Sequence, residues 1–232
     1  MMENSLVDQI RERLRKIRAE IEEVCLECGR DPSEVTLMAV TKTVPAEVVN
    51  LAIEEGITLL GENRAQELLA KYETYSLPAK QIHFIGHLQT NKVRQIIDKV
   101  GMIESVDSLR LAEEIDRCAA AKGITMDILL EVNIAEEPSK SGLLPGEIDS
   151  VLEGIGKLEH VKLRGLMVIP PVGEGALYFE RANKLLIDIR AKKLDNSSMS
   201  ILSMGMSSDY TDAIRFGSSI VRIGRGLFGE RH

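Results

Sequence analysis

The sequence predicts a (β/α)₈ TIM barrel with one extra helix at the N-terminus. Short apolar, β-branched runs alternate with longer amphipathic runs through residues 35–223. Strands that alternate with helices pair in parallel through right-handed crossovers. Eight candidate strands are present, which is the number that closes a TIM barrel. An open doubly wound sheet is the alternative, but no GxGxxG motif follows the first strand.

The N-terminal segment has the pattern of an amphipathic helix. Its apolar residues recur at spacings of three and four, with charged residues between them: Val7, Ile10, Leu14, Ile17, Ile21 and Val24. Fewer than three full heptads repeat, so we expect this helix to pack on the domain rather than form a coiled coil. Gly29 ends the helix, and Asp31-Pro32 marks the turn that follows.

The remaining elements are predicted in chain order. The strands are Val35–Val40, Ile57–Leu60, Ile82–Ile85, Met102–Ser105, Asp127–Asn133, Leu163–Val168, Ser200–Met204 and Ile220–Ile223. The main helices are Ala46–Glu55, Asn91–Val100, Ser108–Lys122, Pro145–Leu158, Gly175–Lys192 and Asp209–Phe216. No low-complexity linker or break in composition interrupts them, so we expect residues 1–232 to form a single domain.

Composition and charge argue against several classes of function. The net charge is −7, and the chain has four Phe, four Tyr and no Trp. An acidic chain with few aromatic residues is a poor candidate for binding nucleic acid. No apolar stretch approaches the roughly 20 residues needed to span a bilayer, and the N-terminus lacks the apolar region of a secretory signal. We expect a cytoplasmic protein with no membrane partner.

Two spacings that can bind metals are interpreted as structural. Cys25 and Cys28 form a CxxC pair that stands alone at the end of a helical pattern. With Cys118 the cysteines number three, an odd count that fits a reducing compartment. His83 and His87 are four residues apart, but Gly86 interrupts any helix between them. We therefore expect no metal site.

Chemistry is expected at the carboxyl ends of the strands, where the active sites of TIM barrels lie. Lys42 closes the otherwise apolar run of the first strand. A lysine in this position loses hydration, which favours the neutral amine that attacks carbonyl groups to form imines. The alternative is a lysine whose side chain simply reaches solvent. Position alone leaves both interpretations open.

The loops after the second and fifth strands are also polar. In the cluster 61–67, Asn63 could cap the following helix or contact a ligand, and the cap is the favoured interpretation. The loop 133–142, which contains Lys140, is too long for a tight turn. Long loops of this kind on barrels often act as lids.

The loops after the seventh and eighth strands predict a phosphate site. Residues 203–209 form a hydroxyl-rich turn at a helix start, and residues 224–229 are rich in glycine. Phosphate sites in barrels recur at these two loops and use backbone amides, so they need no positive net charge. A phosphate site beside a strand-end lysine fits a phosphorylated sugar or aldehyde substrate, as in Schiff-base aldolases, or pyridoxal 5′-phosphate.

Seven motifs across residues 35–229 resemble the pyridoxal phosphate homeostasis protein family, whose fold is similar to the N-terminal barrel domain of alanine racemase. They are AVTKTVP around Lys42, GENRAQE around Asn63, HFIGHLQTNK at 83–92, SKSG at 139–142, RGLMVIP at 164–170, LSMGMSSDYTDAI at 202–214 and GSSIVRIGRGLFG at 217–229. HFIGHLQTNK is the most specific of these motifs to the family.

The resemblance implies the residues of the cofactor site. Lys42 would carry pyridoxal phosphate as a Schiff base. The other members would be Asn63 and Met204 near the cofactor, Ser207 and the amides of Gly224 and Arg225 at the phosphate, and Arg222 opposite the pyridine nitrogen. The family often has a small or hydroxyl residue where this chain has Arg225. The Arg225 side chain either replaces a hydroxyl with charge or points outward.

The resemblance also implies the function. The protein is expected to bind pyridoxal phosphate for intracellular cofactor homeostasis, with effects on amino-acid and keto-acid metabolism and without substantial turnover. Its expected partners are pyridoxal-phosphate-dependent apoenzymes, and it is expected to be a monomer. The alternative is an amino-acid racemase, but alanine racemases add a C-terminal β domain with a catalytic Tyr, and the predicted barrel leaves no residues for one. We therefore expect no catalytic residue.

Overall fold

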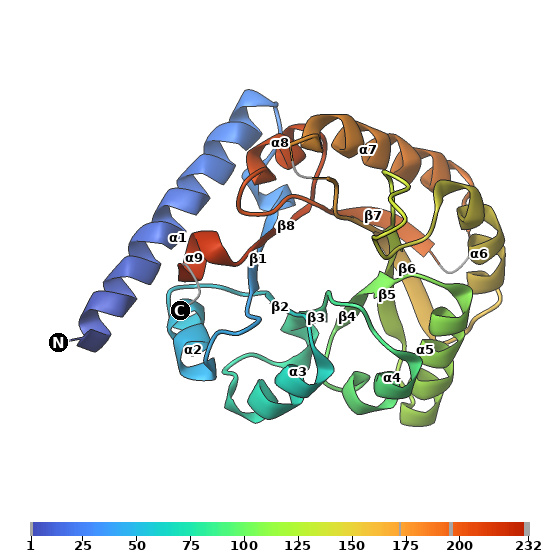
Figure 1. The fold of residues 1–232 in the computed structure, drawn as a ribbon, viewed down its shortest axis with the longest axis horizontal. Coiled ribbons are helices and arrows are strands. Elements are labelled where there is room, and N and C mark those ends of the chain that lie inside the picture. The colour runs from blue at the N-terminus through green and yellow to red at the C-terminus, as the bar shows by residue number, and fades with distance from the viewer. Residues whose placement is uncertain (1, 172, 195–196, 230–232) are drawn as a thin grey trace.

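A computed structural model describes residues 2–171, 173–194 and 197–229, and in these ranges eight parallel strands close into a barrel (Figure 1). The strands are hydrogen-bonded in chain order, and β8 pairs with β1 to complete the ring. The predicted fold class is confirmed. Residues 1 and 230–232 of the predicted domain lie outside the described residues.

Each of the eight predicted strands is present; the bounds of β8 are as predicted, and those of the others differ by one to three residues at an end. The strands are β1 Thr36–Val40, β2 Leu60–Glu62, β3 Ile82–Phe84, β4 Met102–Val106, β5 Met126–Val132, β6 Val161–Val168, β7 Ser197–Ser203 and β8 Ile220–Ile223. The prediction for β2 was wrong in position. Glu62, predicted to lie in a loop, pairs with Phe84 in the sheet and accepts a hydrogen bond from Ile85 N at 2.8 Å.

Helices surround the barrel on the outside (Figure 1). The α-helices are α1 Met2–Glu27, α2 Ala46–Glu54, α3 Ala65–Lys71, α4 Thr90–Ile96, α5 Leu109–Lys122, α6 Ile148–Ile155, α7 Gly175–Ala191, α8 Tyr210–Arg215 and α9 Arg225–Phe228. The 3₁₀ helices are η1 Pro32–Glu34, η2 Tyr72–Thr74, η3 Ala79–Gln81 and η4 Pro145–Glu147. The helix predicted over 145–158 divides into η4 and α6, and α4 ends at Ile96 instead of Val100.

The extra N-terminal helix packs on the barrel, as predicted. α1 runs beside α2, α8 and α9, next to the junction of the first and last strands (Figure 1). Its apolar stripe is buried there, with Ile10 and Leu14 almost fully inaccessible to solvent. This burial accounts for the long helix, because most helical stability in proteins comes from packing an amphipathic face.

Apolar side chains form two groups, one on each side of the barrel wall. The larger group lies between strands and helices and includes Ala39 and Leu60. The smaller group fills the barrel interior: Met38, Val40, Leu59, Ile85, Met102, Leu129, Met167 and Ile220. Neighbouring residues of a strand point to opposite faces, which places Ala39 and Val40 in different groups. Within the described residues, no helix is long and apolar enough to cross a membrane.

Among the glycines, Gly165 in β6 leaves the least room for a Cβ atom. A Cβ atom there would lie 1.7 Å from the carbonyl oxygen of Ile201 in β7. Gly165→Ala therefore requires the two strands to separate, and we expect the free energy of unfolding to fall by about 3 kcal/mol or more. Urea unfolding measures this.

Gly146→Ala is the matched control, because a Cβ at that glycine would meet nothing within 4 Å. We expect it to be neutral or stabilising by about 0.4–1 kcal/mol. Equal unfolding midpoints for the two variants would show that the approach of β6 to β7 does not constrain the barrel.

Candidate functional site

Barrel closure brings the first and last strand ends together at one mouth. β1 and β8 pair from Thr36 with Ile220 to Ala39 with Ile223. Beyond this pairing, a Cβ atom on Gly224 would lie 3.4 Å from the Val40 carbonyl oxygen. Half-buried Lys42 is two residues further along the chain than Val40. The strand-end lysine and the glycine loop of the predicted phosphate site are therefore neighbours.

The two loops predicted to bind phosphate touch each other. The backbone amide of Gly226, in the first turn of α9, donates to Ser207 Oγ at 3.2 Å. The loop after β7 is held in shape by Asp209 Oδ1, which accepts from Met206 N at 2.6 Å. Gly205, at φ 90°, begins this loop, and its carbonyl accepts a hydrogen bond from Arg222 N at 3.0 Å. A hydroxyl and several backbone amides thus gather at this mouth.

Two predicted site residues occupy contrasting positions. Arg225 is exposed at the start of α9, so its side chain lies at the surface. Met204 is fully buried in the apolar group between strands and helices. Its amide donates to Ile220 O at 3.1 Å, and its carbonyl accepts from Ser218 Oγ at 2.8 Å. The structure therefore gives Met204 a packing role beside the loop.

Asn63 lies just beyond the carboxyl end of β2, half-buried. The interpretation of Asn63 as a helix cap was wrong, because the N-cap position of α3 is Arg64. Asn63 is fixed instead by a close backbone approach: a Cβ on Gly86 would lie 2.0 Å from Asn63 O. Ser105 Oγ in turn donates to Gly86 O at 2.5 Å. Asn63 thus remains at the barrel mouth, with its backbone held by the loop after β3.

Arg222 is buried inside the barrel, with only 4% of its surface exposed. Its Nη1 donates to Ser203 Oγ at 2.8 Å, and its Nη2 donates to Val168 O at 3.0 Å. Ser203 Oγ donates to Glu104 Oε2 at 2.6 Å. The other oxygen of Glu104 lies 2.6 Å from His83 Nδ1. A continuous polar chain therefore runs through the barrel interior from β8 to β3.

The barrel interior holds charged groups of opposite sign, the guanidinium of Arg222 and the carboxyl groups of Glu104 and Glu131. Burial lowers the pKa of Arg222 below its usual range, and the carboxylates of Glu104 and Glu131 act against this shift. Burial also raises the pKa of Glu131, although its hydrogen bond from Ser141 favours the ionised form. The interior thus holds a cation that is costly to bury and is balanced by nearby carboxylates.

The loop after β5 is held by hydrogen bonds within itself and by one from Ser141 to β5. Asn133 Nδ2 donates to Glu137 O at 2.8 Å, and its Oδ1 accepts from Glu137 N at 3.1 Å. Ser141 Oγ donates to Glu131 Oε1 at 3.2 Å, while Lys140 is exposed. The described part of the chain contains no group of three or more His, Cys, Asp or Glu residues that could hold a metal ion.

Sequence reasoning missed Glu104, Ser203 and a polar cluster behind Lys42. Glu104 and Ser203 lie in strands that were predicted correctly. A charged residue inside an apolar strand was the signal that could have marked Glu104 as an interior partner of a buried cation. The cluster behind Lys42 includes Glu62 together with Lys71 and Tyr75, which both contact it.

This chain is similar to known proteins over nearly its whole length. The family model "Alanine racemase, N-terminal domain" matches residues 8–232. A pyridoxal phosphate homeostasis protein of Aquifex aeolicus is 40% identical over 224 residues, covering 95% of this chain and 97% of the relative. The structure of PipY from Synechococcus elongatus with pyridoxal phosphate bound has a TM-score of 0.83 and 34% identity, covering 95% of this chain and all of that one.

An alanine racemase of Clostridium difficile shares the fold at a TM-score of 0.75 and 18% identity. The match covers 97% of this chain and 57% of the racemase. Identity at this level supports the barrel architecture and says nothing about activity.

The interior chain predicts a large cost for Glu104→Gln. The variant leaves the buried charge of Arg222 without the carboxylate at the other side of Ser203, and breaking a buried pair in this way costs about 3–5 kcal/mol. Urea unfolding of the protein without added ligand measures the loss. Glu12→Gln, in an exposed pair with Arg15, is the control and should leave the midpoint unchanged.

A second variant tests the cause. In Glu104→Gln/Arg222→Met both charges are gone, so the loss should be smaller than the sum of the two single losses. Strict additivity would show that the two charges do not balance each other.

Proposed function

The chain belongs to the pyridoxal phosphate homeostasis protein family, and we propose that it holds pyridoxal 5′-phosphate at the mouth of its barrel for intracellular cofactor homeostasis, without substantial turnover. The pairing of β1 with β8 carries the proposal, because it sets Val40, two residues before Lys42, against Gly224. The chain would act as one cofactor-binding domain over residues 1–232.

The residues at the mouth suit the two reactive ends of this cofactor. When bound, pyridoxal phosphate supplies an aldehyde that condenses with a primary amine, with loss of water, and a phosphate that requires hydrogen-bond donors. Lys42 offers the amine of the Schiff base. Ser207 and the amides of Gly224 and Arg225 offer donors from two loops that are in contact. Such donors fix an anion without a positive net charge.

Three further residues complete the proposed site. Arg222 would face the pyridine nitrogen, where a fixed cation disfavours protonation of the ring. An unprotonated ring is a weaker electron sink, which limits chemistry on a bound amino acid. Asn63 would contact the cofactor from the end of β2, and Met204 would support the phosphate loop from the core. No residue is proposed as catalytic.

Relatives matched over nearly their whole length carry the name of homeostasis proteins, which favours a carrier over an enzyme. An amino-acid racemase is the alternative, and it is supported by the shared barrel fold alone. The recipients would be pyridoxal-phosphate-dependent apoenzymes in the cytoplasm, and the carrier would act as a monomer.

Lys42 is predicted to be the residue of covalent attachment. Borohydride reduction of the protein loaded with pyridoxal phosphate, followed by peptide mapping, should place the adduct on Lys42. Lys42→Ala should remove both the adduct and the visible absorption band. The other candidates are Lys71, Lys92 and Lys140, and an adduct found mainly on any of them would overturn the assignment.

Racemase activity is predicted to be absent or negligible. Chiral analysis of L-alanine after long incubation with the loaded protein measures it, with free pyridoxal phosphate at the same concentration as the background control. Conversion at about 10 per second, a median enzyme rate, would contradict the carrier proposal.

A further inference from the structure

Lys42 lies in a turn whose backbone is strained. Residues 41–44 form a four-residue turn that is closed by a hydrogen bond from Val44 N to Thr41 O at 3.0 Å. Its third residue, Thr43, has φ 63°. Turns with positive φ at this position normally use Gly or Asn, and a β-branched residue there is an outlier. The strain must be held by contacts from outside the turn.

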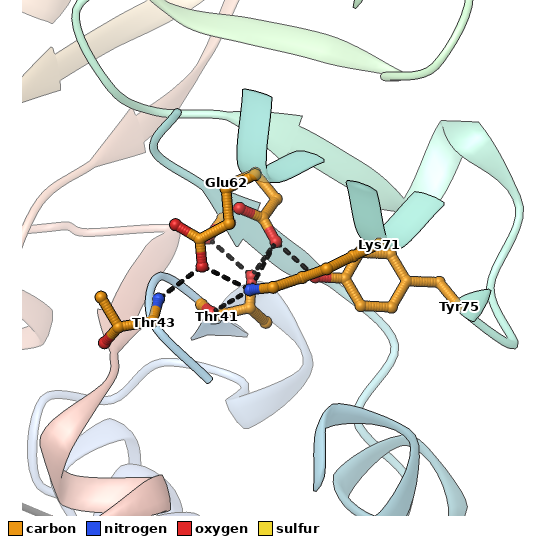
Figure 2. Close-up of polar contacts among 7 residues, drawn as sticks. Thr41, Thr43, Glu62, Lys71 and Tyr75 are labelled. Atoms are coloured by element: carbon orange, nitrogen blue, oxygen red, sulfur yellow. Dashed lines mark hydrogen bonds and ion pairs between the residues drawn. The ribbon is translucent and has the colours of Figure 1, made fainter. Parts of the chain in front are cut away.

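Two charged residues of α3, Glu67 and Lys71, bind the backbone of this turn on both sides of Lys42. Glu67 Oε1 accepts from the backbone amide of Thr43 at 2.5 Å. The same oxygen accepts from Lys71 Nζ at 2.5 Å, and Lys71 Nζ also donates to Thr41 O at 2.9 Å (Figure 2). The carboxylate therefore binds one side of Lys42 in the chain, and the ammonium binds the other.

The buried carboxylate of Glu62 contacts both the turn, at Thr41, and Lys71. Glu62, with no exposed surface on its side chain, accepts from Thr41 Oγ1 at 2.7 Å and from the hydroxyl of Tyr75 (Figure 2). Burial and the charge of Glu62 raise the pKa of Tyr75, so its phenol stays a donor. Lys71 Nζ lies 3.7 Å from Glu62 Oε1, where it balances this second carboxylate.

The cluster lies on the outer side of the barrel wall, behind Lys42. Ala39 belongs to the outer apolar group and Val40 to the inner one. Leu60 also belongs to the outer group, and period-two alternation within β2 puts Glu62 on the same side. Thr41, whose hydroxyl donates to Glu62, therefore faces this side too. The contacts from α3 thus hold the turn without occupying the space inside the mouth.

We propose that Glu67 and Lys71, supported by Glu62 and Tyr75, are positioning residues for Lys42. They stabilise the strained turn and so keep the amine of Lys42 at a high effective concentration at the barrel mouth. The inference rests on the proposed function, because it takes Lys42 as the point of attachment. Releasing strain of this kind should change the population of the held turn about tenfold.

The test measures how strongly Lys42 competes for bound cofactor. Protein loaded with pyridoxal phosphate is titrated with methylamine, reduced with borohydride and weighed as intact protein by mass spectrometry. The methylamine concentration that halves the protein-linked fraction reports the effective concentration of Lys42. In Glu67→Ala we expect it to fall about tenfold, while total bound cofactor, measured after release by base, stays within about twofold because the phosphate loops are intact.

A suppressor identifies the cause. Thr43→Gly removes the strain, since glycine adopts positive φ freely. In the Glu67→Ala/Thr43→Gly double variant, the half-displacing concentration should return to within about twofold of wild type. A merely structural role for Glu67 would not be rescued by a change in the turn.

Matched controls exist elsewhere in the chain. Lys193 also has positive φ, at 51°, and Glu153 forms an exposed i,i+4 pair with Lys157. Lys193→Gly and Glu153→Ala should leave the half-displacing concentration unchanged. If Glu67→Ala does not show cooperative unfolding, Glu67→Gln takes its place. That variant keeps an acceptor for Thr43 N but loses the charge that holds Lys71, so a smaller fall with the same rescue is expected.

Two results would overturn the inference: a Glu67 variant that competes like wild type, or a double variant that stays at the value of the single variant. Wild-type protein with no cofactor linked at Lys42 would remove the proposed function and the inference together. Linkage at Lys42 that is insensitive to Glu67 would remove the inference alone.

Discussion

The hydrogen-bonded pairing of β1 with β8 is the constraint on which the rest of the structure depends. These two strands lie far apart in the sequence, and their four paired positions set the relative height of their carboxyl ends. Closing the ring places Val40, two residues before Lys42, against Gly224. A barrel puts the carboxyl ends of its strands at one mouth, so the loops that follow the strands face the same space. The helix α1 packs over this junction through its contacts with α2, α8 and α9, and thereby stabilises the closure from outside.

The two sides of the barrel wall carry different polar systems. Inside, Arg222 is joined through Ser203 to Glu104, so a buried cation is kept in one place by hydrogen bonds. Outside, Glu67 and Lys71 bind the turn that contains Lys42. Period-two alternation makes this division possible, because adjacent strand residues serve opposite faces. In the proposed site the inner system would act on the pyridine ring and the outer system on the attachment point, so each end of the cofactor would have its own support.

Local patterns predict the fold and propose part of the site. Alternating apolar runs located all eight strands, and strand-end reasoning pointed to Lys42 and to the loops 203–209 and 224–229. The roles of Ser207 and Gly224 at a phosphate came from the family resemblance alone, and they stay predictions. The predicted position of β2 was wrong because the strand includes Glu62, a charged residue that the sequence pattern assigns to a loop. Glu62 is buried only because distant residues of the chain supply its partners, and no local pattern reports them. The i,i+4 pair of Glu67 and Lys71 likewise looks in sequence like an ordinary surface pair. The structural role of this pair follows from its hydrogen bonds to Thr43 and Thr41 in the turn.

The cluster behind Lys42 is better explained by the shape of the turn that it holds than by a gain in the stability of the fold. It brings two carboxylates and one ammonium into a little-exposed space, and one oxygen of Glu62 has no hydrogen-bond partner among the described residues. Apolar side chains of similar volume would often pack there at no loss of stability, because burying charges costs desolvation energy. They could not accept a hydrogen bond from the amide of Thr43, however, nor donate one to the carbonyl of Thr41. Holding both sides of the strained turn at once takes an acceptor and a donor, and here a carboxylate and an ammonium fill these roles and neutralise each other. The cost of burying them is therefore tied to fixing the position of Lys42.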